Sequence, residues 1–147
     1  MHPSLVLLHG ANGAGRLLAP LAEPLRAFAA VETPDLLGHG GRPVPERFSV
    51  AEFAADVLAY LDARGIERAV LFGYSFGGYL ALYLARRFPE RVRALCTLAA
   101  KYVFDEATVK HFSYLADPDR LRRPGNPRAK QLEQAHAPQD WVAITNN

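Results

Sequence analysis

Four short apolar runs, separated by stretches of helical character, most constrain how this chain can fold. The runs are Leu5–Leu8, the alanine-rich Phe28–Thr33, Ala69–Phe72 and Val92–Leu98. Their apolarity is continuous rather than alternating, which is typical of strands buried on both faces of a parallel sheet. Strands that alternate with helices pack as layers joined by right-handed crossovers. The sequence therefore predicts an α/β fold in which helices flank a parallel sheet.

The helix between the second and third runs has the clearest predicted boundaries. Ser49 is a suitable N-cap, and Glu52 follows it at the capping-box spacing. Phe48 and Phe53 occupy the positions of a hydrophobic staple, and Gly65 is placed to end the helix. An apolar face follows at helical spacing, made of Val50, Phe53, Ala54, Val57, Leu58 and Leu61.

Prolines shape the predictions for two other regions. After the first run, a leucine stripe predicts a helix in which Pro20 suits the first turn, whereas Pro24 is expected to kink or break it. Beyond about residue 100 the sequence has helical stretches separated by prolines and no convincing strand.

Composition narrows the class of protein. The chain has 147 residues, 50% of them hydrophobic, which is enough for one domain with its own core. The formal net charge is +2 and no basic stripe with interleaved aromatic residues is present, so we expect no nucleic-acid partner. With no apolar run of membrane-spanning length and no signal-peptide pattern, we expect no membrane partner and a cytoplasmic location. Cys96 is the only cysteine, and its apolar surroundings predict a buried, inert thiol.

The segment GYSFGG, residues 73–78, contains the pattern G-x-S-x-G between a predicted strand and a predicted helix. A nucleophilic serine on such a sharp turn needs small neighbours, and Gly73 and Gly77 supply them. The turn would lift the Ser75 hydroxyl above the sheet. The N–H of Phe76 would point to the same space, at a helix N-terminus where negative charge is favoured. The segment predicts Ser75 as a nucleophile, with a non-catalytic Gly/Ser turn as the plainer alternative.

The segment LLHGANGAG, residues 7–15, allows two functional interpretations. A glycine-rich loop after a strand is also found in dinucleotide-binding domains, where Glu32 would serve the ribose, but the glycine spacing here is G-x-x-G-x-G. The favoured interpretation is an oxyanion loop, in which the N–H groups of Ala11 and Phe76 stabilise negative charge beside Ser75. His9 would then brace the loop rather than act as a base.

The segment PDLLGHGGRP, residues 34–43, contains Asp35, His39 and Arg42. Residues of these types in a glycine-rich turn are expected to form hydrogen bonds within the loop, and no second cluster suggests a metal. We therefore expect neither a metal nor a cofactor.

Three segments, LLHG, DLLGHGGRP and GYSFGGY, in this order and with these gaps, resemble the α/β-hydrolase superfamily of the serine type. The later stretches LAAKYVFDEATVK and HAPQDW resemble the lid region of small bacterial members. The resemblance implies a core over residues 1–100 and part of a helical lid over residues 101–147. It also implies a nucleophile at Ser75 and an oxyanion hole formed by the N–H groups of Ala11 and Phe76. The implied activity is hydrolysis of an ester, a thioester or a related carbonyl compound through an acyl-enzyme. The substrate is then a small molecule.

The chain departs from the family after Leu98. In this family the acid and then the histidine of the triad follow the nucleophile. No strand-like run follows Leu98, so we expect the last strands and both triad members to be absent from a chain that is truncated at its C-terminus. Asp105, His111 and His136 are weak candidates, and both histidines are expected on helical surfaces. The alternative to an active esterase is therefore a non-catalytic product, or a small-molecule binding module that keeps the fold.

Two further expectations concern surfaces. If no strand follows Val92–Leu98, this strand lies at the edge of the sheet, with unpaired backbone groups through which copies can associate near Arg93–Leu98. Aromatic residues around the nucleophile would line a pocket for a modest acyl or aromatic group: Phe76, Tyr79, Tyr102, Phe104 and Phe112.

Overall fold

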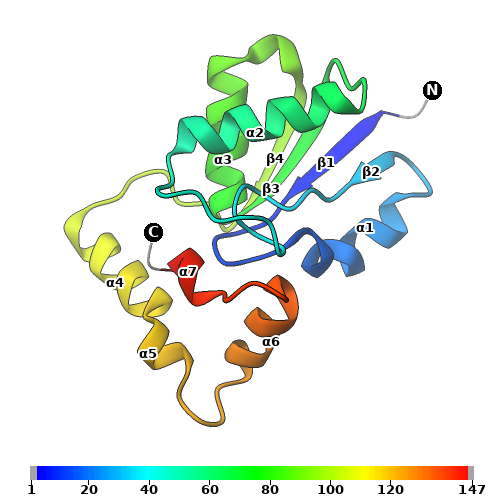
Figure 1. Ribbon diagram of the computed structural model, residues 1–147. Coiled ribbons are helices and arrows are strands. Elements are labelled where there is room, and N and C mark those ends of the chain that lie inside the picture. Colours follow the sequence, from blue (N-terminus) through cyan, green and yellow to red (C-terminus); the bar gives the residue numbers. More distant parts are fainter. Residues whose placement is uncertain (1–2, 146–147) are drawn as a thin grey trace.

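The computed structural model describes residues 3–145. Within this range the strands form a four-stranded sheet with the order β2-β1-β3-β4, and every neighbouring pair is parallel (Figure 1). The strands are β1 (Ser4–Leu8), β2 (Ala30–Glu32), β3 (Ala69–Tyr74) and β4 (Val92–Leu98). The predicted parallel α/β fold is confirmed, and each strand lies at an apolar run of the sequence.

The order of the strands determines where a site can form. From β1 the chain moves to β2 on one side, and β3 then lies on the other side of β1. Leu8 at the end of β1 is in register with Gly73 in β3, so the loops that follow both strands leave the same edge of the sheet. Ligands bind outside the carboxyl ends of the strands at such a change of direction.

Helices cover the two faces of the sheet unequally. Helices α2 (Val50–Ala63) and α3 (Phe76–Arg87) pack on one face, where they form the main core with β1 and β3. On the other face, the turn η1 (Gly15–Leu18) and α1 (Ala19–Leu25) cover mainly β1 and β2 (Figure 1). A short turn η2, Pro89–Arg91, leads into β4.

Helix α2 has the predicted ends. The Glu52 N–H donates to the Ser49 side-chain oxygen at 3.2 Å, and the rings of Phe48 and Phe53 stack with their centroids 5.1 Å apart. Gly65 has a φ of 63°, the left-handed conformation that ends many helices. Helix α1 includes Pro24 and ends at Leu25, one residue beyond it, close to the predicted break. A proline this close to a helix terminus removes only one hydrogen bond.

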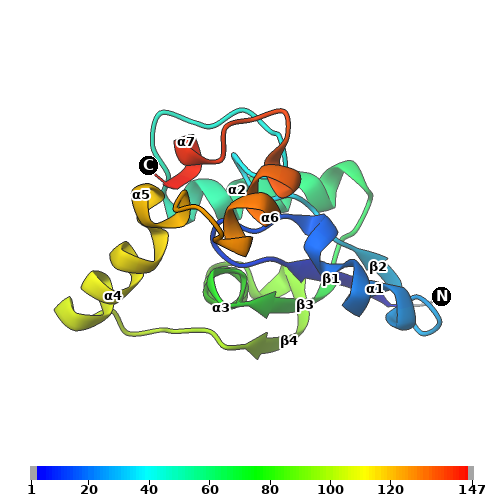
Figure 2. The same cartoon turned by 90° about the horizontal axis from the view of Figure 1, so that it is seen from below.

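Residues beyond β4 form four helices within the described part of the chain: α4 (Glu106–Ala116), α5 (Pro118–Leu121), α6 (Pro127–His136) and α7 (Val142–Thr145). They lie beyond the carboxyl ends of the strands (Figures 1 and 2). Their own small core consists of Leu121, Leu132 and Trp141. None of the helices within residues 3–145 is both long and apolar enough to cross a membrane.

Strand β4 lies at the edge of the sheet, as predicted. Within residues 3–145 it pairs with β3 alone (Figure 2). Cys96 is exposed, so the prediction of a buried thiol is wrong. Its register partner in β3 is Phe72. On this face of the sheet, α1 packs mainly against β1 and β2. Because α1 does not reach β4, Cys96 is exposed to solvent.

Candidate active site

Ser75 occupies a sharp turn between β3 and α3. Its backbone has φ 53° and ψ −117°, a conformation that residues with side chains rarely adopt. The Ser75 N–H donates to the Leu98 carbonyl at 2.9 Å, and the Ser75 carbonyl accepts from the Gly78 N–H at 3.0 Å. Strain of this kind persists where the surrounding structure enforces it, and it is concentrated at functional sites.

Two glycines allow this turn to form. A Cβ atom at Gly73 would collide with the backbone of Gly77, and a Cβ atom at Gly77 would collide with the carbonyl of Leu8. The start of α3 therefore packs directly against the ends of β3 and β1. This close approach gives the physical reason for glycine on both sides of Ser75.

The loop after β1 reaches the same turn. A Cβ atom built at Gly10 would lie 3.2 Å from the Cβ of Ser75. Ala11, Ser75 and Phe76 all line one cavity of about 220 Å³. The three residues that the sequence predicts as nucleophile and oxyanion hole thus come together, although they derive from two separate loops.

This cavity, the Ser75 cavity, is mainly apolar. Its other lining residues are Tyr79, Lys101, Phe104, Phe112 and Ala116. Four of the five aromatic residues predicted to line a pocket do so. The exception, Tyr102, donates its hydroxyl to the Thr97 side chain at 2.7 Å. Lys101 and Ala116 were missed, because nothing in the local sequence indicates that the segment after β4 folds over Ser75.

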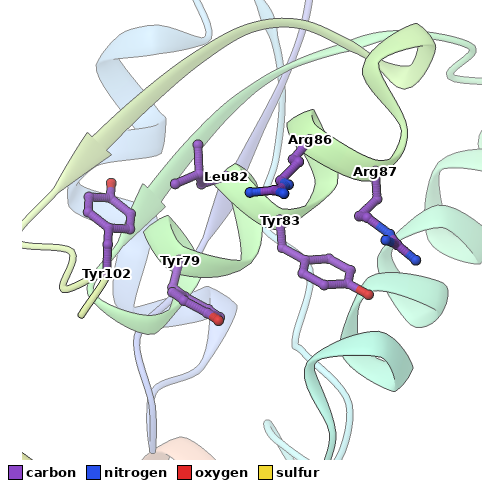
Figure 3. Close-up of a pocket in the computed structure, with 6 residues that line it drawn as sticks. All are labelled: Tyr79, Leu82, Tyr83, Arg86, Arg87 and Tyr102. Carbon is purple, nitrogen blue, oxygen red and sulfur yellow. The ribbon is translucent and has the colours of Figure 1, made fainter. Parts of the chain in front are cut away.

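A separate cavity of about 400 Å³ lies along the outer side of α3 (Figure 3). Tyr79 lines both this cavity and the Ser75 cavity. The remaining lining residues are Leu82, Tyr83, Arg86, Arg87 and Tyr102. The two cavities are therefore neighbours separated by one aromatic side chain.

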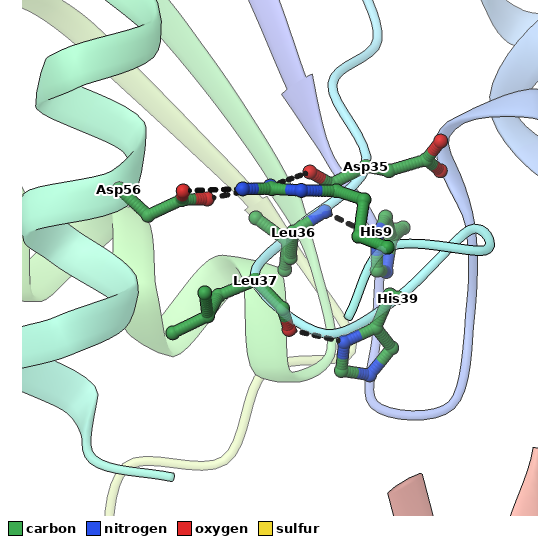
Figure 4. A network of polar contacts seen from close by, with 7 residues as sticks. His9, Asp35, Leu36, Leu37, His39 and Asp56 are labelled. Atoms are coloured by element: carbon green, nitrogen blue, oxygen red, sulfur yellow. Dashed lines mark hydrogen bonds and ion pairs between the residues drawn. The ribbon is translucent and has the colours of Figure 1, made fainter. Parts of the chain in front are cut away.

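His9 is buried and joins two loops. Its Nε2 accepts from the Leu36 N–H at 3.0 Å (Figure 4). Its Nδ1–H donates to the Gly10 carbonyl at 2.8 Å. Burial lowers the pKa of His9 to about 3, so the ring is neutral. With both nitrogens occupied by backbone groups, His9 braces the loop as predicted.

The loop after β2 is held by hydrogen bonds, also as predicted. The Asp35 carboxylate accepts from the Gly15 N–H at 2.7 Å, and Arg42 forms a two-point ion pair with Asp56 at 2.6 and 2.8 Å. The Nδ1–H of His39 donates to the Leu37 carbonyl at 2.8 Å (Figure 4). Burial lowers the pKa of His39 to about 4.

His136 corrects one prediction, because it is fully buried rather than on a helical surface. It lies at the end of α6, where its Nδ1 accepts from the Gly40 N–H at 3.1 Å and its Nε2–H donates to the Asn12 carbonyl at 3.2 Å. Its ring centroid lies 5.8 Å from that of His39. Burial lowers its pKa. The ring thereby ties α6 to the loops after β1 and β2.

The other weak candidates lie on α4. Asp105 caps this helix, accepting from the Thr108 N–H at 2.8 Å, and hydrogen bonds to Thr108 lower its pKa. His111 is exposed, as predicted. Within residues 3–145, no histidine or carboxylate forms a hydrogen bond with the Ser75 hydroxyl. The structure therefore does not join these candidates to the nucleophile.

Glu32, the acidic residue of the dinucleotide alternative, is engaged elsewhere. Its carboxylate accepts from the Tyr60 hydroxyl at 2.6 Å and from Arg64 at 3.0 Å. These bonds lower the pKa of Glu32, although burial opposes them as the largest single effect. The carboxylate thus fixes α2 to β2.

A third cavity, of about 290 Å³, adjoins the loop after β1 and was not anticipated. We call it the Arg128 cavity. Its lining residues are His9, Gly10, Ala11, Asn12, Gly13, Leu17, Leu18, Tyr74, Arg128, Gln131 and Leu132. Ala11 also lines the Ser75 cavity. The lining residues from α6 are Arg128, Gln131 and Leu132. Their position depends on how the helices beyond β4 pack, and no local sequence pattern indicates this packing.

Comparison with known proteins agrees with this geometry. The family model described as alpha/beta hydrolase fold matches residues 3–136. The chain is 35% identical over 141 residues to the lipase LipV of Mycobacterium tuberculosis, covering 94% of this chain and 53% of the lipase. It is 38% identical over 94 residues to a pimeloyl-[acyl-carrier protein] methyl ester esterase of Neisseria meningitidis, covering 64% of this chain and 35% of the esterase.

Solved structures share the fold. A hydrolase from Pseudomonas aeruginosa superposes with a TM-score of 0.76 at 20% identity, covering 98% of this chain and 62% of that one. The enol-lactonase of Burkholderia xenovorans gives a TM-score of 0.75 at 18% identity, covering 100% of this chain and 64% of the enzyme. The chain thus spans about half the length of many relatives that it matches. With its parallel sheet, its serine turn and the matching family model, the chain belongs to the alpha/beta hydrolase family.

Proposed function

We propose that the protein is a serine hydrolase that cleaves a carboxylic ester or thioester through an acyl-enzyme, with Ser75 as nucleophile. One observation supports this most strongly. Ser75 stands on a strained turn with a φ of 53°, and it shares its cavity with Ala11 and Phe76 from the two loops expected to hold an oxyanion.

The proposed reaction has two steps. The Ser75 hydroxyl oxygen attacks the carbonyl carbon of the substrate, and the negative charge that forms on the carbonyl oxygen is stabilised by the N–H groups of Ala11 and Phe76. The hydroxyl proton passes through a general base to the departing alcohol or thiol, leaving an acyl group on Ser75. Water then attacks the acyl-enzyme, releases the acid and restores the serine.

Among the described residues, no side chain is placed to act as the general base for Ser75. In this family the acid and the histidine follow the nucleophile in sequence. The chain spans 62% of the Pseudomonas hydrolase and 64% of the enol-lactonase. The proposal assigns base and acid to the portion of the family fold that residues 3–145 do not include.

The substrate class follows from the relatives and the cavity. Their names include a lipase, a methyl ester esterase and an enol-lactonase, which all describe cleavage of carboxylic esters. Phe104 and Phe112 give the Ser75 cavity an apolar wall that suits an acyl or aromatic group. In this proposal the helices α4–α7 act as a lid that excludes water from the reacting carbonyl.

A fluorophosphonate probe tests the proposal directly. We expect covalent labelling of Ser75, detected by peptide mass spectrometry, and its complete loss in the Ser75→Ala variant. A folded protein that shows no labelling above this variant would contradict the assignment of Ser75 as an activated nucleophile.

The second candidate is a small-molecule binding protein without catalysis. It is favoured by the observation that, among the described residues, the Ser75 hydroxyl has no histidine partner. A serine without a base is a weak nucleophile. This candidate predicts that apolar esters bind to the wild-type protein and to Ser75→Ala with equal affinity, measured by calorimetry, while no ester is hydrolysed.

A further inference from the structure

The Arg128 cavity and the Ser75 cavity share Ala11, in the loop after β1. Resting on the proposed function, we propose that it is a subsite for an anionic group of the substrate, held by Arg128 with help from Asn12 and Gln131. The substrate class is then an ester whose acyl chain ends in a carboxylate or carries a phosphate.

The two cavities are close enough to serve one ligand. Ala11 lines both of them, and the consecutive residues Tyr74 and Ser75 each line one. A Cβ atom at Gly10 would lie 3.1 Å from the Tyr74 ring and 3.2 Å from the Ser75 Cβ, so the loop after β1 packs directly against both residues. In the proposal, a substrate attached at Ser75 extends past Ala11 into the Arg128 cavity.

Three residues that line this cavity have side chains without protein partners, and two of them, Arg128 and Gln131, are exposed. The Arg128 backbone N–H is bound to Asn126 at 3.0 Å, but its guanidinium has no hydrogen bond or ion pair within residues 3–145. The side-chain amides of Asn12 and Gln131 are likewise unpartnered in the part of the chain that the structure describes. Arginine and amide side chains that lack protein partners can bind a ligand at the wall of such a cavity.

The local charge favours an anion. No aspartate or glutamate is among the residues that line this cavity. An adjoining hollow shares Leu17 and Gln131 and adds Arg16, whose guanidinium also has no partner among residues 3–145. Elsewhere, several arginines pair with carboxylates: Arg26, Arg42, Arg64, Arg91 and Arg122.

The chemistry of arginine fits this role. A guanidinium binds a carboxylate or phosphate through two parallel hydrogen bonds, which fixes the orientation of the ligand. Leu17, Leu18 and Leu132 provide apolar walls for the methylene groups between the anion and the ester. The subsite would position the ester carbonyl at Ser75 by holding the far end of the acyl chain.

The cavity on the outer side of α3 is the competing location, since it has Arg86 and Arg87 and shares Tyr79 with the Ser75 cavity (Figure 3). Both of its arginines come from one helix, and it has no side-chain amide. The Arg128 cavity is preferred because it shares Ala11, the proposed oxyanion residue, with the Ser75 cavity, whereas the cavity along α3 shares Tyr79. Arg86 nevertheless supplies a matched control.

Binding to the Ser75→Ala protein tests the subsite without requiring activity. The ligands are the 4-nitroanilides of succinic, glutaric and adipic acid, each with one free carboxylate, and the neutral 4-nitroanilides of butyric, pentanoic and hexanoic acid. We expect calorimetry to show that one diacid derivative binds at least about tenfold more tightly than its neutral match, as for a charge-assisted hydrogen bond. The corresponding ω-phosphate derivative decides between carboxylate and phosphate.

Substitutions then locate the anion. Arg128→Gln should abolish the advantage of the charged ligand and leave the neutral ligand unaffected, while Arg128→Lys should keep part of it. Arg86→Gln and Lys130→Gln, an exposed cation on α6, should leave both ligands unaffected. Equal binding of charged and neutral ligands, no binding of either, or a loss caused by Arg86→Gln instead of Arg128→Gln would overturn the subsite.

Fluorophosphonate labelling of Ser75 separates this inference from the function on which it rests. Absence of labelling together with Arg128-dependent binding would refute the hydrolase and retain the anion site. Labelling together with charge-independent binding would retain the hydrolase and refute the anion site.

Discussion

The Nε2–H of His136, at the end of α6, donates to the backbone carbonyl of Asn12 at 3.2 Å. Asn12 directly follows Ala11, the residue shared by the Ser75 and Arg128 cavities. One buried imidazole thus attaches the helices beyond β4 to the loop that carries the proposed oxyanion N–H.

Removing this imidazole should loosen the helices. In His136→Ala, the partly buried Gly40 N–H and Asn12 carbonyl lose their partner, and each lost hydrogen bond costs about 0.5–1.5 kcal/mol. Urea unfolding should show this loss, and amide exchange should accelerate in α6. The control is His111→Ala on the exposed face of α4, which should change stability by less than about 0.5 kcal/mol. Equal effects of the two substitutions would refute the role of His136.

Acid should destabilise the fold through the buried histidines. Burial lowers the pKa of His39 to about 4 and that of His9 to about 3, from an ordinary value of 6.5. Between these values the unfolded chain binds more protons than the folded one, so stability falls as the pH falls below about 6.5. The slope for each histidine is about 1.4 kcal/mol per pH unit inside its window.

Urea titrations between pH 7 and pH 4 measure this slope. His39→Gln should reduce it, because the variant has one fewer group to protonate on unfolding. A stability that is constant from pH 7 to pH 5 in the wild-type protein would contradict the neutral state of these rings.

The serine turn should tolerate loss of the hydroxyl but not an added methyl group. In Gly77→Ala the new Cβ would meet the Leu8 carbonyl, and we expect a loss of about 3 kcal/mol because both partners are backbone in closely packed elements. Ser75→Ala should remain folded and lose only the labelling. Thermal melting of the two variants side by side makes the comparison, and a Gly77→Ala protein as stable as wild type would show that the turn is not tightly packed.

We also propose that copies of the chain associate through β4. The strand pairs with β3 alone among the described residues, and Ala94, Cys96 and Leu98 are exposed along it. Exposed apolar edges pair readily with other strands, and a charge on the edge prevents it. Sedimentation should reveal a concentration-dependent dimer that Ala94→Lys converts to a monomer. A wild-type protein that is monomeric and melts in one cooperative step would refute this proposal.

Local sequence patterns predicted much of the fold because they act over short distances. The apolar run at Val92–Leu98 coincides with β4, and the cap at Ser49 marks the start of α2. The turn at Ser75 was recognisable because its glycines are neighbours in sequence. These features depend on residues within one strand, one helix or one turn.

Predictions failed where the outcome depends on distant contacts. The hydrogen bonds of His136 span 96 and 124 positions in the sequence, so its burial could not be inferred from α6 itself. Cys96 lies in an apolar run, but its exposure depends on whether another element covers that face of the sheet. The Arg128 cavity was missed for the same reason, since α6 and the loop after β1 meet only in the folded chain.

The bond from the Ser75 N–H to the Leu98 carbonyl connects the proposed nucleophile to the last residue of the outermost strand. The backbone of Ser75 is therefore held by the edge strand β4, whose other side is unpaired within residues 3–145. A strand added to the free side of β4 would hold Leu98 by backbone hydrogen bonds and, through this bond, the backbone of Ser75. The position of the Ser75 hydroxyl then depends partly on what pairs with the free side of β4.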